Sequence, residues 1–194
     1  GTKAGEDLSS GGYNNLIGYA AGSSLTSGNS NVAIGVNALL TEDTGGRSIA
    51  IGEGALQLQN NDDNNYNIAI GHSAGNLIST GTGNTIVGGF AGDAITTGIN
   101  NVAIGRSALS TEDTYGFNVA VGTYALLNQN AGDNGYNTAV GYGAGENIAT
   151  GLKNTLIGAE AGDALTTGSN NIVIGYNAAA SAVGVSNEVT IGDS

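Results

Sequence analysis

A glycine recurs along the chain at an almost constant spacing, and this recurrence limits the possible folds more than any other feature. It follows Ile or Val each time, and successive copies are 17 or 19 residues apart. These anchor glycines are Gly18, Gly35, Gly52, Gly71, Gly88, Gly105, Gly122, Gly141, Gly158, Gly175 and Gly192, and Gly1 continues the series backwards. Four units span 70 residues, so "AGDAITTGINNVAIG" at 91–105 returns as "AGDALTTGSNNIVIG" at 161–175. The chain is therefore a repeat array, with single units nested in four-unit blocks.

Each unit places the same residue types in the same columns. The β-branched column includes Ile34, Ile70, Ile104 and Ile174; the alanine column includes Ala38, Ala74, Ala108, Ala144 and Ala178; the asparagine column includes Asn31, Asn67, Asn101, Asn137 and Asn171. A β-branched residue before a glycine favours a short strand followed by a turn. Stacked units would place like residues about 4.8 Å apart. We therefore expect an apolar ladder, an asparagine ladder bonded to the coils above and below, and alanines where a larger side chain would meet a neighbouring backbone.

The period decides the fold class. A 17-residue unit is too short for helix pairs, and no window shows sustained helical periodicity. We predict an all-β parallel β-roll, or β-solenoid, of about 11 coils. Residues 1–194 form one repeat domain, expected to be a window from a longer fibre, with partial blocks at 1–17 and 158–194 and full blocks at 18–87 and 88–157. Four of the coils run into polar loops, which are 41–47, 60–66, 111–117 and 130–136.

The strand phrase "NVAIG" is apolar on both faces. Val102 and Ile104 point to one face, and Asn101 and Ala103 point to the other. One face can fill the interior of a coil, and a strand that is apolar on both faces is usually covered on both. We therefore expect parallel partner chains in a cyclic homotrimer. The alternative is a monomeric solenoid with a narrow, alanine-lined second sheet.

Composition excludes several function classes. The net charge is −12 with only four Lys and Arg, which is too few cations to neutralise nucleic-acid phosphates. The chain has no Cys, so disulfides and thiol chemistry are excluded. It also lacks a run of 18 apolar residues, so we expect no membrane insertion in this segment.

The strand phrase resembles a known family. "NVAIGVNA" at 31–38 and "NVAIGRSA" at 101–108 are similar to the head repeats of trimeric autotransporter adhesins and to related phage tail-fibre repeats. The resemblance implies a left-handed parallel β-roll that trimerises, located outside the cell on a bacterial surface or a virion tail fibre. The longer units and the four-coil block depart from the family pattern, and the choice between adhesin and tail fibre stays open.

Catalytic and metal chemistry find little support in the sequence. The only histidine, His72, occupies a variable column, so we predict no enzyme and no cofactor. The acidic loop residues are Glu42, Asp43, Asp62, Asp63, Glu112, Asp113 and Asp133. Such loops could supply oxygen ligands to calcium, but the calcium-binding nonapeptide is absent. We predict solvated loops without a metal, with calcium as the alternative.

These observations favour a structural and adhesive fibre segment. Its loops would contact a cell-surface glycan or protein receptor, and the candidate contacts are Tyr66, Tyr115, Tyr124 and Tyr136, because aromatic rings stack on sugars. The competing interpretation is that these rings cover the ends of apolar columns. Two other functions stay open: a self-assembling extracellular filament subunit and a glycan-degrading tailspike segment.

Overall fold

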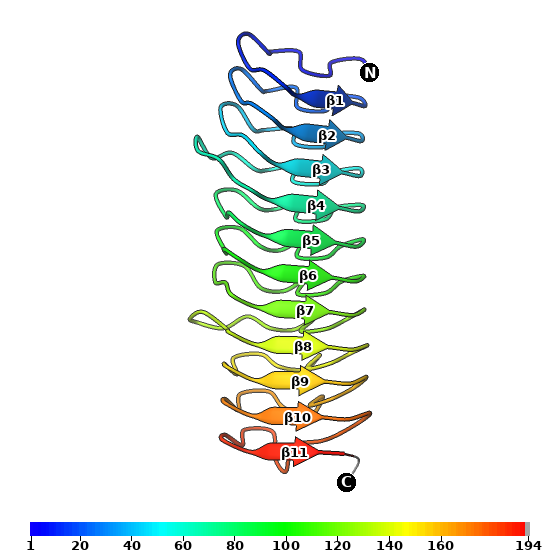
Figure 1. Ribbon diagram of the computed structural model, residues 1–194, viewed down its shortest axis with the longest axis vertical. Helices are drawn as coiled ribbons and strands as arrows, with labels where there is room; N and C mark the ends of the chain where they lie inside the picture. The colour runs from blue at the N-terminus through cyan, green and yellow to red at the C-terminus, as the bar shows by residue number, and fades with distance from the viewer. Residues whose placement is uncertain (193–194) are drawn as a thin grey trace.

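The computed structural model describes residues 1–192 as a rod of stacked coils, with one short strand in each coil (Figure 1). The strands are β1 (Asn15–Ile17), β2 (Val32–Ile34), β3 (Ile49–Ile51), β4 (Ile68–Ile70), β5 (Thr85–Val87), β6 (Val102–Ile104), β7 (Val119–Val121), β8 (Thr138–Val140), β9 (Thr155–Ile157), β10 (Ile172–Ile174) and β11 (Val189–Ile191). They form one parallel sheet of 11 strands in chain order. The predicted all-β solenoid is confirmed, whereas its left-handedness and the trimer stay predictions.

Neighbouring strands pair without any shift in register. Val102 lies beside Val119, and Ile104 lies beside Val121. The same alignment holds across the 19-residue unit, where Ile51 lies beside Ile70. The two extra residues are absorbed by loops 60–66 and 130–136, which project from the rod between β3 and β4 and between β7 and β8 (Figure 1). The predicted columns are therefore real stacks, and insertions leave the sheet unchanged.

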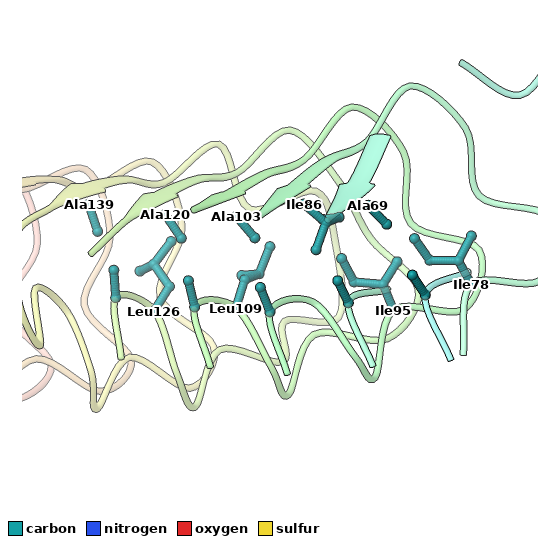
Figure 2. Close-up of a cluster of buried hydrophobic side chains, with 14 of the residues drawn as sticks. Ala69, Ile78, Ile86, Ile95, Ala103, Leu109, Ala120, Leu126 and Ala139 are labelled. Atoms are coloured by element: carbon teal, nitrogen blue, oxygen red, sulfur yellow. The ribbon is translucent and has the colours of Figure 1, made fainter. Parts of the chain in front are cut away.

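The interior of each coil is filled by the middle residue of the strand and by one large residue from the opposite turn. Figure 2 shows Ala103 and Ala120 pointing towards Leu109 and Leu126, and all four are fully buried. Where the strand carries a large residue, such as Ile86, the facing position is a glycine, Gly92. This exchange of large and small residues keeps the narrow interior close-packed.

The two strand faces are thereby assigned, and the assignment corrects the expected apolar ladder. The alanine face lies inside, so the alternative of an alanine-lined outer sheet is wrong. Ile34, Ile70, Ile104 and Ile174 do stack in register, but on the outer face of the sheet, where Ile70 and Ile104 are each 37% exposed. The physical reason is space, because each turn already supplies one Leu or Ile to the interior.

The asparagine column is buried and links each coil to the next. The Oδ1 atom of Asn101 accepts a hydrogen bond from the backbone N–H of Asn118 at 3.0 Å, and its Nδ2 donates to the carbonyl of Tyr115 at 3.2 Å. The same two bonds recur at Asn31, Asn67, Asn137 and Asn171. The ladder therefore runs mainly from side chain to backbone, with additional amide-to-amide bonds within the column from Asn84 to Asn67 and from Asn171 to Asn154.

The alanine column matches the expectation of a crowded position. Ala38, Ala74, Ala108, Ala144 and Ala178 have no exposed surface. Over residues 1–192 the fold contains strands and turns, and it offers no helix that could cross a membrane.

Candidate interaction surface

The outer sheet face consists of the first and third residues of strands β1 to β11, and most of them are apolar; the polar members are Asn15, Thr85, Thr138 and Thr155. Exposed fractions reach 59% at Ile17, 40% at Ile157 and Ile172, and 74% at Ile191. Because the strands pair in register, these residues form two continuous columns along the whole sheet. A contiguous apolar surface of this kind marks an interaction site in a soluble protein.

Aromatic residues flank this face on the turn that precedes the strands. Tyr66 and Tyr136 are 55% and 50% exposed. The Tyr136 ring stacks on Phe117 with centroids 5.2 Å apart, and the guanidinium of Arg47 lies 5.5 Å from the Tyr66 ring and donates to its hydroxyl at 2.6 Å. All four residues have positive φ angles, and residues other than glycine and asparagine rarely adopt this backbone conformation.

A second group of aromatic residues flanks the face on the turn that follows the strands. Tyr124 lies 6.0 Å from Tyr142 in an edge-to-face arrangement, with the guanidinium of Arg106 5.6 Å from its ring. Phe90 packs edge-on against His72 at 5.0 Å. Tyr124 was among the predicted contacts, whereas Tyr142 and Phe90 were missed, although their signal was present in the one or two residues after each anchor glycine.

The four tyrosines predicted as receptor contacts do not form one cluster. Tyr66 and Tyr136 lie on the turn before their strands, in different blocks, and Tyr124 lies on the turn after β7. Tyr115 is half-buried in its loop, where its N–H donates to Glu112 and its carbonyl accepts from Asn101. Both Tyr66 and Tyr136 therefore belong to the margin of the outer sheet face as much as to the loops.

Charge is segregated between this face and the rest of the coil. Arg47, Arg106 and Lys153 each lie two residues from the end of a strand. Among the described residues, Glu53 and Glu188 are the only acids within two residues of a strand. Glu160 lies on the turn that follows β9, and most other surface acids occupy the turns away from the sheet; these include Asp43, Asp62, Asp63, Asp93, Asp113, Asp133, Glu146 and Asp163. The apolar face is thus almost free of the negative charge that dominates the chain.

Two of the predicted loop acids are not in solvent, which corrects the solvated-loop prediction for them. Glu42 and Glu112 are fully buried and point into the coil. Each carboxylate accepts hydrogen bonds from a glutamine one coil further on, Gln59 or Gln129. Burial raises the pKa of both carboxyls above the ordinary glutamate value. The signal for this stacking was the 17-residue spacing between each Glu and its Gln.

The remaining acidic candidates stay at the surface. Asp43 and Asp113 are partly exposed, and Asp62, Asp63 and Asp133 are exposed. Within residues 1–192, no three Asp, Glu, His or Cys side chains gather closely enough to hold a metal ion, and no cleft opens. The carboxylates of Glu42 and Glu112 face N–H donors rather than a space between oxygen ligands.

Comparison of the chain with protein-family models, with curated proteins and with solved structures finds no match. The functional argument therefore rests on the residues of this chain and on the geometry of its outer sheet face.

Proposed function

We propose that the chain is a non-catalytic, structural and adhesive segment of an extracellular fibre, and that its copies pack together through the outer sheet face. The observation that carries this proposal is the pair of exposed β-branched columns that runs along the rod without interruption. Such a surface suits parallel association of rods along their length. It offers no pocket for a small substrate.

A closed homotrimer is the simplest assembly that covers this face. Parallel rods related by a rotation axis bring the same columns together in every copy, and closure leaves no apolar face free for further growth. The charge distribution supports the same contact, because juxtaposed like charges would oppose it. With most acids on the far turns, the faces can meet without strong repulsion.

Receptor contact is assigned to the polar loops, which lie outside the sheet. Loops 41–47, 60–66, 111–117 and 130–136 differ between blocks, whereas the columns do not. Surface loops on a rigid scaffold are the usual place for binding residues. The partner would be a glycan or protein on a cell surface, and the likeness of the strand phrase to adhesin and tail-fibre repeats supports a location on a bacterium or a virion.

The glycan-degrading alternative has less support. A glycosidase needs two carboxyls about 5–10 Å apart on either side of a bound sugar. Glu42 and Glu112 are buried in different blocks, and each is bonded to a glutamine of the next coil. The filament alternative needs end-to-end contacts, and no observation on the described coils favours them over the lateral face.

One substitution tests the lateral contact. Light scattering on a size-exclusion column should give the mass of a trimer for the wild-type chain and that of a monomer for Ile104→Lys, because the new charge would be buried between copies. The circular dichroism of the variant should not change, since Ile104 lies outside the coil. The matched control is Leu77→Lys, because Leu77 is also an exposed apolar residue, at 42%, but lies outside the outer sheet face. A monomeric wild type, or equal behaviour of the two variants, contradicts the proposal.

A further inference from the structure

Two carboxyl chambers recur inside the rod at equivalent places in the two full blocks. The first chamber contains Glu42, Ser48, Gln59, Asn65 and Asn67, and the second contains Glu112, Asn118, Gln129, Gly135 and Asn137. All of these residues are buried. In each chamber the glutamine nitrogen faces the carboxylate, and the glutamine oxygen accepts from an asparagine of the ladder, Asn67 or Asn137.

The first chamber surrounds its carboxylate with three donors. The Oε1 atom of Glu42 accepts from the N–H of Gly45 at 2.9 Å. The Oε2 atom accepts from Gln59 and from the Nδ2 of Asn65, each at 2.9 Å. Donors stabilise the charged form of a carboxyl and oppose the effect of burial. The donors of the first chamber therefore offset part of the effect by which burial raises the pKa of Glu42.

The second chamber has one side-chain donor fewer, and its contacts from Tyr115 and Gln129 are longer, although backbone hydrogen bonds from Ala131 and Asp113 also lower the pKa of Glu112. Glu112 accepts from the N–H of Tyr115 at 3.2 Å and from Gln129 at 3.4 Å. Gly135 stands where the first chamber has Asn65, so the third donor is missing. The second chamber carries an asparagine side chain at another position, Asn118, which corresponds to Ser48 in the first chamber. The Nδ2 atom of Asn118 has no hydrogen-bond partner.

The residues at positions 118 and 135 constrain one another sterically. A Cβ atom on Gly135 would lie 2.0 Å from the Oδ1 of Asn118 and 2.3 Å from the Nε2 of Gln129. Asn118 and Gln129, as they are placed here, therefore exclude an asparagine at position 135, whereas the first chamber, with the smaller Ser48 in place of Asn118, contains Asn65. The pair of positions decides whether the carboxylate receives its third donor.

The charged surroundings do not compensate for the missing donor. The only charged side chain that acts on either carboxyl is the neighbouring aspartate, Asp43 or Asp113, and its repulsion adds to the burial that raises the pKa. On the facing loop, the Asp133 carboxylate is turned to the N–H of Asn134. A buried charge at Glu112 is thus less well satisfied than one at Glu42.

We propose that the second chamber is a proton-uptake site, at which Glu112 binds a proton at a higher pH than Glu42, and that Asn118 and Gly135 set this difference. Proton uptake removes a poorly satisfied buried charge from loop 111–117. A carboxyl whose pKa is raised by folding contributes stability that is fully present below its unfolded pKa and is lost as the pH rises through the folded pKa. The loop is therefore held most firmly in acidic solution.

Carboxyl titration by carbon-13 NMR on the complete chain tests the order of proton binding. The two signals are assigned with Glu42→Gln and Glu112→Gln. We expect the Glu112 midpoint to lie at the higher pH. Coincident midpoints or the reverse order overturn the proposal. In thermal unfolding between pH 4 and 8, the melting temperature of the wild type relative to Glu112→Gln should fall as the pH rises, and a constant difference counts against a raised pKa.

The exchanged pairs provide a test that does not depend on removing a carboxyl. Asn118→Ser with Gly135→Asn gives the second chamber the donor set of the first, and it should move the Glu112 midpoint to lower pH. Ser48→Asn with Asn65→Gly should move the Glu42 midpoint to higher pH. Gly135→Asn alone should lower the melting temperature because of the clash. If neither double variant shifts its midpoint, these residues do not set the proton affinity.

Discussion

At the scale of single residues, the anchor glycines are fixed by the backbone of the next coil. Gly105 has a φ of 131°, and a Cβ atom there would lie 2.5 Å from the carbonyl carbon and oxygen of Gly122. Other left-handed positions are less strict, because Leu109 adopts a φ of 52° while its side chain is fully buried. Left-handed backbone costs about 1–2 kcal/mol for a residue with a side chain, and burial of a leucine returns a similar amount or more. No such compensation is available at Gly105, where the obstacle is main chain.

The substitution Gly105→Ala should therefore lower the free energy of unfolding by at least about 2 kcal/mol, because overpacking and backbone strain act together. Guanidinium unfolding followed by circular dichroism measures this change. Gly132→Ala is the matched control, since its Cβ would meet nothing within 4 Å, and it should change stability by no more than about 0.5 kcal/mol. Equal effects of the two substitutions would mean that the coils are not packed at the anchor as described.

At the scale of the structural element, a three-residue strand is too short to be stable alone, and the asparagine ladder holds successive strands together. Asn101 closes two hydrogen bonds with the next coil while having no exposed surface. Its removal leaves the N–H of Asn118 and the carbonyl of Tyr115 buried without that partner. Unsatisfied buried groups cost about 1–3 kcal/mol each.

Asn101→Ala should therefore reduce stability by about 2–4 kcal/mol and speed hydrogen exchange at the amide of Asn118. Asn128→Ala serves as the control, because Asn128 is exposed, and its effect should stay within about 0.5 kcal/mol. Unchanged exchange at Asn118 in the first variant would show that the ladder bond does not protect this amide.

The strands also show which parts of the fold could be predicted from the sequence. The spacing of Gly105 and its counterparts predicts the unit length, the columns and the parallel stack. The reason is that residues in one column meet the same surroundings in every coil only if the coils are stacked. The side of the strand that faces inward did not follow, since Ala103 and Ile104 are both apolar. The answer depends on how much space Leu109 leaves, which is a packing property. Glu112 was placed in solvent for a related reason, because its charge suggested exposure and its partner Gln129 lies 17 residues away.

At the scale of the whole molecule, each coil contacts only its neighbours, so stability should be close to a sum of coil and interface contributions. Deletion of 88–157 removes one four-coil block and joins Val87 to Gly158, which restores the anchor phrase and every column. We expect a shorter folded rod with a lower melting temperature. Deletion of 88–153 leaves four extra residues at the junction, so the coils on either side should stack poorly there and the melting temperature should fall further than after the in-register deletion. If the chain with the in-register deletion does not fold, the blocks are not interchangeable.

The segregation of charge sets a limit on the size of the assembly. Once the apolar faces of several rods have closed on one another, the surface left in solution carries most of the carboxylates of every copy. Such a surface behaves like that of a charged colloid, since bundles repel one another within the Debye length of about 8 Å at physiological salt and retain a shell of counterions and water. The protein would therefore grow into bundles of fixed thickness that stay dispersed, and the acids on the back of each coil would determine where assembly stops.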